Sequence, residues 1–331
     1  MTAIQPDHEE LLALIGKEYY LDNLSKVDIA QRYGISRFQV ARYLDEAREE
    51  GIVRIEVRFP GSAGAVDPAR LAERLGITRV VVVRSHNDEV LQRDLLAQAV
   101  AAELMAATRS GMTVGVSWSR TLDVAARHVT RLPKCDVVQL AGALPGTGNS
   151  NPLELIQRLG RVSEGRVWPL WAPLVVDSAQ TAAGLRQQPE ISTALTKADS
   201  LDLAAIAIGA WSPGLSTVWD RVDNLVRQAG IAAGAVAECS GRLVDARGES
   251  VRSELEGRVL AVTLAQLKRT PAVIAVAQGA ARAAAVRAAI AAGIVSTLVA
   301  DEELAAALSS GANAAEEPGH PDRAGLSGGA G

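Results

Sequence analysis

The sequence predicts an α/β protein built from two domains of different kinds, a small all-α domain followed by a larger α/β domain. Residues 25–51 contain two short helical patterns separated by a glycine, which is typical of a helix-turn-helix. From residue 69 onward, short apolar runs alternate with helical patterns, as in a doubly wound, Rossmann-like domain with a parallel sheet. Between them, a stretch rich in Pro, Gly and Ala breaks both patterns.

These observations place the domain boundaries. We expect a helix-turn-helix domain over 1–59, a linker over 60–68, an α/β domain over 69–309 and a disordered tail over 310–331. The tail is rich in Gly, Ala, Pro and charge, which cannot build a core.

Composition limits how the chain could bind nucleic acid. The 331 residues carry a formal net charge of −4, and the first 60 hold eight Lys and Arg against eleven Asp and Glu. A polycation that coats nucleic acid is therefore excluded, and DNA binding requires a local patch. Arg32, Arg37 and Arg42 form such a patch, with no acidic residue between them.

The helix-turn-helix is predicted from the spacing of its caps. Ser25 and Ser36 stand where a hydroxyl accepts the first amide hydrogen bond of a helix, and Gly34 supplies the left-handed turn between them. A preceding helix over Glu9–Leu21 would support the pair. The residues expected to form the shared core fall at helical intervals: Ile29, Ala30, Ile35, Val40 and Leu44.

The outward face of the second helix suits reading of the DNA major groove. Arg can form two hydrogen bonds to guanine, and Gln can do the same to adenine. The C-terminal end of this helix is acidic, so only its first two turns could lie against DNA. An alternating run over 52–59 predicts a strand or wing whose arginines could contact phosphates. The candidate DNA-binding residues are Ser36, Arg37, Phe38, Gln39, Arg42 and Arg54.

The α/β domain is predicted from its buried strands. A parallel sheet covered on both faces has nearly continuous apolar strands and binds ligands at their carboxyl ends. A helix is expected over 90–109 and another from Thr121. Strands are expected over 79–83, 112–118, 136–140, 203–209, 272–277 and 296–300.

Four segments could line a ligand site. In GVSWSRT, residues 115–121, hydroxyls, amides and Arg120 could converge on an anion at a helix start, although Ser and Thr at a helix start are more often plain N-caps. Residues 140–152 form a lid or a simple connection, and residues 211–219 form an ordered turn with two packed tryptophans. Arg282 stands in the first turns of a helix, where a bound anion would offset its unfavourable interaction with the helix dipole; from the residues alone, a solvated arginine is the default.

Several function classes lack support. The two cysteines, Cys135 and Cys239, are far apart and belong to no Cys/His cluster, so we expect neither a disulfide framework nor a zinc site. No common catalytic or nucleotide-binding motif is present, and we expect no cofactor. No apolar run approaches the roughly 20 residues of a membrane span, which favours a soluble, cytoplasmic protein.

Several collinear segments resemble those of one family. IAQRYGISRFQVARYLDEAREEGIVRIEV is similar to a family DNA-binding segment, GVSWSRT to its first ligand loop, and PLWAPLVVDS to its proline-containing middle strand. AIAIGAWSP, GAVAECSGRLVDARG and the segment from LAQLKRTPAVIAVAQGAARAAAV to ADEELA continue the match. The chain thus resembles the SorC family of sugar-responsive bacterial transcriptional regulators over nearly its whole ordered length.

The resemblance implies a regulator that contains no catalytic site. Its effector domain would be similar to sugar-phosphate isomerases and deaminases of the glucosamine-6-phosphate deaminase type, and would bind a small, phosphorylated sugar. Homo-oligomers, dimers or tetramers, would bind palindromic double-stranded DNA operators. Compared with the family, the loop after residue 140 is more apolar and offers no lysine for an imine. The implied effector-binding residues are Gly115, Ser117, Ser119, Arg120, Thr121, Gly142, Thr147, Gly148 and Arg282.

Two other functions stay open at this stage. One is a sugar-phosphate isomerase or deaminase with an accessory helical domain, which needs an acid/base pair in the pocket. The other is a binding module whose helix-turn-helix mediates only protein contacts. The sign of regulation and the effector are not encoded in any recognisable motif.

Overall fold

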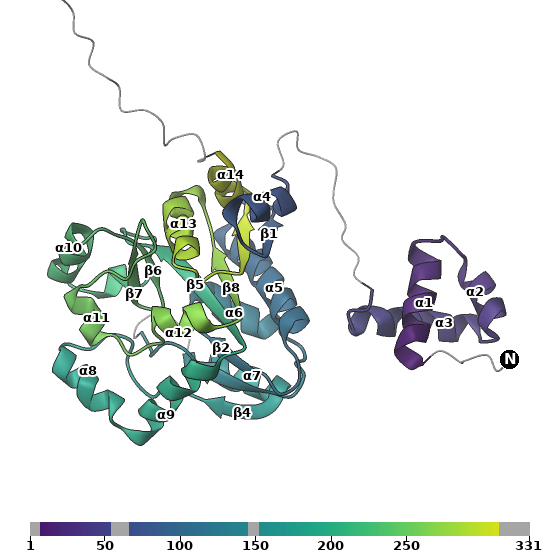
Figure 1. Ribbon diagram of the computed structural model, residues 1–331, viewed down its shortest axis with the longest axis horizontal. Coiled ribbons are helices and arrows are strands. Elements are labelled where there is room, and N and C mark those ends of the chain that lie inside the picture. The colour runs from purple at the N-terminus through teal and green to yellow at the C-terminus, as the bar shows by residue number, and fades with distance from the viewer. Residues whose placement is uncertain (1–6, 54–65, 145–151, 311–331) are drawn as a thin grey trace, which may run out of the picture. The chain divides into compact units, whose positions relative to one another are not determined.

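The computed structural model describes residues 7–53, 66–144 and 152–310 of the chain. The chain divides into two compact units, Met1–Ala63 and Gly64–Gly331. The first unit is all-helical and the second is α/β (Figure 1), in agreement with the two predicted fold classes.

Three helices form the first unit, and local hydrogen bonds define their ends. Ser25 and Asp28 form a reciprocal capping box at the start of α2. The Ser36 hydroxyl accepts a 3.2 Å hydrogen bond from the Gln39 amide at the start of α3. Gly34 ends α2 at φ 65°, in the left-handed region that favours glycine. The predicted caps and turn are thus confirmed. The helices are α1 (His8–Tyr20), α2 (Lys26–Tyr33) and α3 (Arg37–Glu49).

A small core holds these helices together. Its buried members come from all three helices: Ile15, Ile29, Ala30, Val40 and Leu44. All of these except Ile15 were predicted from the sequence. Ile35 packs at the rim and is only partly buried. Of the predicted wing, Ile52 and Val53 lie in no strand. Arg54 and the rest of that segment lie outside the described residues.

The second unit is built on a mainly parallel sheet. In the described ranges the main path of the sheet runs in the order β1-β9-β8-β5-β2-β3-β4, with every neighbouring pair parallel. An antiparallel hairpin, β6–β7, extends from β5. The strands are β1 (Arg79–Val83), β2 (Thr113–Val116), β3 (Cys135–Gln139), β4 (Glu164–Trp168), β5 (Leu203–Ala210), β6 (Ala235–Cys239), β7 (Arg242–Asp245), β8 (Ala272–Ala277) and β9 (Thr297–Asp301).

Both faces of this sheet are buried, because successive side chains of each strand point to opposite sides. In β8, Ile274 and Val276 belong to one apolar cluster, whereas Val273 and Ala275 belong to another. The first cluster includes residues of α5, α6 and α7, and the second includes residues of α4, α13 and α14. The doubly wound architecture is therefore confirmed.

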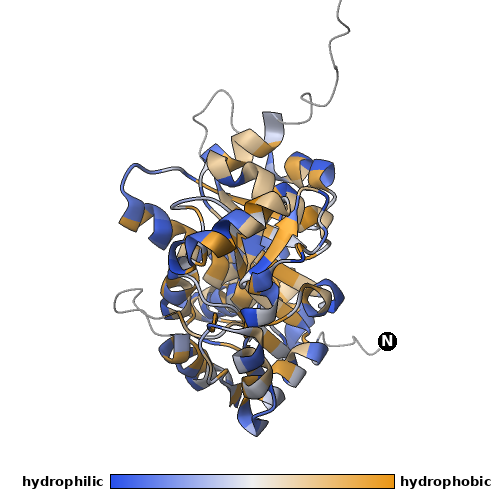
Figure 2. Cartoon of the chain, turned by 90° about the vertical axis from the view of Figure 1, so that its left-hand side faces the viewer, coloured by the Kyte–Doolittle hydropathy of each residue, from blue (hydrophilic) through white to orange (hydrophobic). Residues whose placement is uncertain are grey.

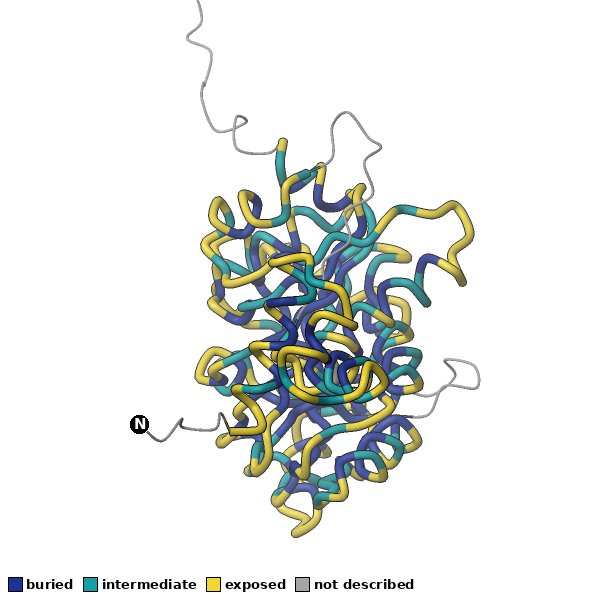
Figure 3. Tube along the Cα trace, turned by 90° about the vertical axis from the view of Figure 1, so that its right-hand side faces the viewer, coloured by how far each residue is buried: buried dark blue, intermediate teal, exposed yellow. Residues whose placement is uncertain are grey.

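Helices cover the sheet with one apolar side each, and their polar sides are visible on the outside (Figure 2). The buried stretches follow the strands and the inner sides of the helices (Figure 3). The helices of this unit are α4 (Pro68–Leu75), α5 (Glu89–Ala107), α6 (Arg120–His128), α7 (Pro152–Ser163), α8 (Ala179–Arg186), α9 (Pro189–Lys197), α10 (Asn224–Ala232), α11 (Glu254–Arg258), α12 (Leu264–Arg269), α13 (Ala283–Ala291) and α14 (Glu302–Ser310).

One expected strand is absent from the described part of the structure, and three strands are present that the sequence did not predict. The segment PLWAPLVVDS, residues 169–178, contains no strand; it makes only isolated bridges at Pro173 and Val175. Proline has no amide N–H to donate to a ladder, which explains why pairing does not extend there. Strands β4, β6 and β7 were not expected from the apolar runs. The predicted tail lies outside the described residues from Gly311 onward.

Candidate functional site

A cavity lies at the carboxyl ends of the three central strands β8, β5 and β2. Its walls come from the segments that follow these strands: residues 117–121 after β2, residues 215–218 after β5, and Gln278 and Arg282 after β8. Doubly wound sheets bind ligands at this edge. Sequence and structure therefore indicate the same part of the fold.

The loop between β2 and α6 brings three predicted hydroxyl residues to the cavity, Ser117, Ser119 and Thr121. Ser119 is the N-cap of α6, and its hydroxyl accepts a 3.1 Å hydrogen bond from the Leu122 amide. The Ser117 hydroxyl lies 2.9 Å from that of Ser240 in a buried hydrogen bond. The capping alternative thus holds for Ser119, although its side chain also borders the cavity.

Gly115 does not line the cavity. It lies within β2, where a Cβ atom would come within 2.7 Å of the Leu140 side chain. The glycine is needed for close packing between β2 and the end of β3.

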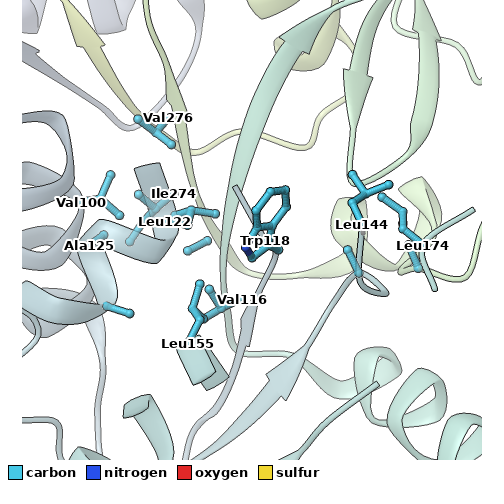
Figure 4. Packing of buried hydrophobic residues seen from close by; sticks show 14 of the residues in the cluster. Val100, Val116, Trp118, Leu122, Ala125, Leu144, Leu155, Leu174, Ile274 and Val276 are labelled. Atoms are coloured by element: carbon cyan, nitrogen blue, oxygen red, sulfur yellow. The ribbon is translucent and has the colours of Figure 1, made fainter. Parts of the chain in front are cut away.

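Trp118 forms an apolar part of the wall and is buried. Figure 4 shows it between the side chains around Val116 and Leu122 and those of Leu144 and Leu174. An indole in this position offers a flat apolar surface to a ligand beside it.

The loop after β3 contributes Gly142. The Gly142 amide donates a 3.0 Å hydrogen bond to the Leu260 carbonyl, and a Cβ at this position would come within 2.6 Å of the Ala172 carbonyl oxygen. Only glycine fits between these two backbone segments. Thr147 and Gly148, predicted for the same loop, lie outside the described residues.

Three arginines border the cavity, Arg93, Arg120 and Arg282. Arg282 donates a 2.6 Å hydrogen bond to the Gln278 carbonyl. Burial and the neighbouring Arg120 guanidinium lower the pKa of Arg282, and Asp301 partly opposes this effect. Within the described residues, no hydrogen bond or ion pair is found for the Arg120 guanidinium group. An anion between Arg120 and Arg282 would relieve their mutual repulsion.

A buried carboxyl group stands in the same cavity. Glu238 of β6 accepts a 2.9 Å hydrogen bond from the Ser216 hydroxyl and a 2.5 Å hydrogen bond from the Gly241 amide. Burial raises the pKa of Glu238, although these two donors act in the opposite direction. The cavity therefore combines a cationic region with a carboxyl group whose pKa is raised by burial.

Several lining residues were not among the predicted effector-binding residues: Arg93, Ser216, Thr217, Glu238, Ser240 and Gln278. The packed-tryptophan interpretation of residues 211–219 is correct, because the Trp211 and Trp219 rings meet edge-on with centroids 5.1 Å apart. However, Ser216 in that turn also reaches the cavity. The acidic ECSG sequence at the end of a buried strand was the available signal for Glu238.

In the first unit, the start of α3 presents the predicted DNA-reading side chains. Arg37 and Phe38 are exposed, and the Arg37 guanidinium lies 5.0 Å from the Phe38 ring centroid. Arg42 lies 5.6 Å from the Tyr43 ring centroid. The Gln39 side-chain amide donates a 3.1 Å hydrogen bond to the Tyr43 hydroxyl. Neither arginine forms an ion pair within the described residues, so both guanidinium groups can accept an anionic partner.

Arg32 differs from these two arginines. Its guanidinium lies 2.7 Å from the Glu18 carboxylate, an ion pair that neutralises it and raises its pKa. The positive patch of three arginines expected from the sequence is therefore reduced to Arg37 and Arg42 on α3.

Other kinds of site find no support in the described ranges. These residues contain no cluster of His, Cys, Asp and Glu suited to a metal ion. Cys135 and Cys239 are both buried and unpaired with each other. None of the helices described is long and apolar enough to cross a membrane.

Comparison with known proteins gives a consistent result. The family described as "Putative sugar-binding domain" matches residues 68–309. The transcriptional regulator LsrR of Enterobacter sp. (strain 638) is 27% identical over 312 residues, which cover 91% of this chain and 93% of that protein. The transcriptional regulator YjhU of Escherichia coli K12 is 28% identical over 296 residues, covering 86% and 89% of the two chains.

Solved structures share the fold. The full-length sorbitol operon regulator SorC from Klebsiella pneumoniae superimposes with a TM-score of 0.66 at 21% identity, covering 91% of this chain and 98% of that one. A domain of a possible sugar-binding transcriptional regulator from Arthrobacter aurescens TC1 superimposes with a TM-score of 0.67 at 23% identity, covering 76% of this chain and all of that domain.

Proposed function

The chain belongs to the SorC family of sugar-binding transcriptional regulators, and from this premise we propose that a phosphorylated sugar in the cavity of the second unit controls its affinity for a palindromic operator. The observation that carries the proposal is that Arg120, the first residue of α6, and Arg282, which directly precedes α13, line the same cavity.

A phosphate group suits this corner of the cavity for two reasons. Two guanidinium groups, that of the partly buried Arg282 and that of the exposed Arg120, favour a dianion and can form charge-assisted hydrogen bonds to it. The first turns of helices also carry unpaired amide groups and a partial positive charge. Ser117, Ser119 and Thr121 add hydroxyl groups at the start of α6.

The remainder of the cavity suits the polyhydroxyl part of the same molecule. Glu238, Ser240 and Gln278 offer hydrogen-bonding groups to sugar hydroxyls, and Trp118 offers an apolar surface to the carbon skeleton. We assign Gly142 to the wall of the pocket, and Thr147 and Gly148 to the loop that follows it. A small phosphorylated sugar combines the anionic and hydroxyl groups that these residues could bind.

We further propose that the chain regulates without catalysis. A sugar-phosphate isomerase or deaminase needs a pair of acid/base groups at the reacting carbons. The described lining contains one carboxyl group, Glu238, and neither histidine nor lysine. An enzymatic function would require turnover of hexose or hexosamine phosphates by the purified chain.

On the DNA side, we assign groove contacts to Arg37, Phe38, Gln39 and Arg42, helix capping next to DNA to Ser36, and phosphate contacts to Arg54. The first 60 residues carry more acidic than basic side chains, so a single copy offers little positive charge to DNA. We therefore propose that the chain acts in the cytoplasm as a dimer or tetramer that places two or more copies of α3 on one operator.

The effector would act by favouring one arrangement of the subunits over another. A coupling free energy of about 1–3 kcal/mol changes operator affinity by roughly 5- to 150-fold. Such a coupling requires only that the effector bind one arrangement more tightly than the other.

A gel-shift assay tests the proposal. The full chain is mixed with DNA from its own promoter region at moderate salt, with and without a panel of sugar phosphates and the corresponding unphosphorylated sugars. We expect a retarded complex whose amount changes with one phosphorylated sugar. Absence of any bound DNA would refute the regulatory function, and an equal response to the unphosphorylated sugar would refute the role of the phosphate.

Two arginine variants identify the binding site of that sugar. Arg282→Ala should abolish its effect on the gel shift. Arg247→Ala serves as the matched control because Arg247 is 83% exposed, pairs only with the nearby Asp245 in the described structure, and does not line the cavity. The control should respond like the unmodified chain.

A further inference from the structure

Phe38 is an exposed aromatic side chain on a helix whose inner face is well packed. Its exposed fraction is 74%, whereas Val40 and Leu44 on the same helix are buried. Among the described contacts of Phe38, the Arg37 guanidinium stacks on its ring at 5.0 Å. The side chain therefore does not contribute to the core of this unit and is free to contact a partner outside it.

The position of Phe38 on α3 favours DNA as that partner. It is the second residue of the helix, next to Arg37 and one turn before Arg42. Residues four apart lie on the same side of a helix, so Phe38 and Arg42 share a face. In a helix-turn-helix the N-terminal residues of the second helix contact the base edges in the major groove.

The chemistry of the groove then limits what Phe38 can contact. Base edges in the major groove offer hydrogen-bonding groups and one apolar group, the C5-methyl of thymine. A phenyl ring cannot form the paired hydrogen bonds that identify guanine or adenine, but it can bury that methyl group. Stacking also restricts the Arg37 guanidinium, which reduces the entropy lost when it binds guanine.

We propose that Phe38 recognises a thymine by its C5-methyl group, at a position next to the guanine bound by Arg37, in each half of the operator. This inference rests on the proposed DNA-binding function and adds the chemical identity of the base. It makes Phe38 a determinant of operator sequence.

The test uses DNA selected by the protein itself. The full chain enriches a sequence from a random duplex pool, once alone and once with glucose 6-phosphate, fructose 6-phosphate and ribose 5-phosphate. Each thymine of the enriched half-site is then replaced by uracil, which lacks only the methyl group. We expect one position at which the substitution weakens binding roughly fourfold per half-site, the effect of removing one buried methyl group.

A double-mutant cycle assigns this effect to the residue. Phe38→Ala should bind the thymine operator more weakly than the unmodified chain does. This variant should bind the thymine and uracil operators with the same affinity. Leu21→Ala is the matched control, since Leu21 is also 74% exposed in the same unit but lies after α1. This control should keep the full preference for thymine.

Two outcomes would overturn the inference alone while leaving operator binding intact. One is that replacement of each thymine by uracil leaves the operator affinity unchanged at every position. The other is that the replacement of thymine by uracil weakens binding by the same factor in Phe38→Ala as in the unmodified chain. A change in the sedimentation coefficient of this variant would then indicate that Phe38 contacts a protein partner. A chain that enriches no sequence under any condition would overturn the DNA-binding function together with the inference.

Discussion

Two pairs of arginines in this chain differ in their surroundings. Arg37 and Arg42 are exposed on α3 and stack against the aromatic residues that follow them. Arg120 and Arg282 line one cavity; Arg120 is exposed, whereas Arg282 is partly buried and burial lowers its pKa. The comparison predicts that solvent screens an anion bound by the α3 pair more than an anion bound beside Arg282.

Removal of the exposed pair should have the largest effect. Arg37→Ala combined with Arg42→Ala should weaken operator binding at least about 30-fold for each half-site, because two bidentate base contacts contribute about 2–6 kcal/mol together. Fluorescence anisotropy with labelled operator measures the loss. The thermal shift produced by the sugar phosphate should not change in this variant.

Retention of operator binding by the double variant would contradict this role of α3. If the oligomer dissociated instead while DNA binding persisted, the helix-turn-helix would mediate protein contacts.

Arg282→Ala should have the next largest effect, on the sugar phosphate rather than on DNA. Loss of a hydrogen bond to a charged group costs about 1.5–3 kcal/mol, which corresponds to a roughly 10- to 150-fold weaker affinity. Isothermal titration calorimetry measures this change. The ligand-free variant should unfold at the same temperature as the unmodified chain or slightly higher, because the substitution removes repulsion between Arg282 and Arg120.

A large decrease in the melting temperature of ligand-free Arg282→Ala would instead indicate that this arginine mainly stabilises the fold. Arg247→Ala, the exposed control, should change neither the sugar-phosphate affinity nor the melting temperature appreciably.

Salt should separate the two sites. Between 50 and 200 mM salt, operator binding should weaken on the order of 100-fold if two arginines in each of two copies displace counterions. Partly buried charges are screened less, so sugar-phosphate affinity should change less than about tenfold. Parallel titrations of both ligands check this difference. Equal salt dependence would mean that the cavity arginines are as solvated as those of α3.

Glu238→Gln should have the smallest effect, on the pH dependence of stability. The pKa of Glu238 is raised in the folded chain because the carboxyl group is buried. Its favourable contribution is therefore present below the pKa of an unfolded glutamate and is lost as the pH rises through the folded pKa. Melting temperatures of both chains between pH 4 and 8 should show the unmodified chain losing stability relative to Glu238→Gln as pH rises.

If the difference between these two melting temperatures stays constant over that range, Glu238 has the same pKa in both states. Burial would then affect the pKa of Arg282 but not the pKa of Glu238.

The first unit was largely predictable because its determinants are local. Ser25, Gly34 and Ser36 act within one helical turn, through capping hydrogen bonds and a left-handed backbone conformation. Pairing between distant residues was not predictable in this way. Arg32 belongs to the same segment, yet its neutralisation depends on Glu18 of another helix.

In the α/β unit, the apolar strands and the edge at which a ligand binds were also predictable. Buried parallel strands are continuous apolar runs, and the ends of those runs identify the ligand-binding edge. The apolar pattern failed for β4, at one end of the strand order, and for the antiparallel hairpin. In β4, for example, Glu164 and Arg166 are exposed, so the strand shows no continuous apolar run.

The sequence by itself thus determined the fold class and the caps of the helix-turn-helix, because these depend on nearest neighbours and on burial periodicity, and it offered Arg120 and Arg282 as candidates for a ligand site. Only the tertiary structure decided that Glu238, Ser216 and Arg93 join them. These three residues come from β6, from the turn after β5 and from α5, and no local pattern encodes which of them meet. Their convergence depends on strand order and helix packing, which are set by contacts between residues far apart in the chain.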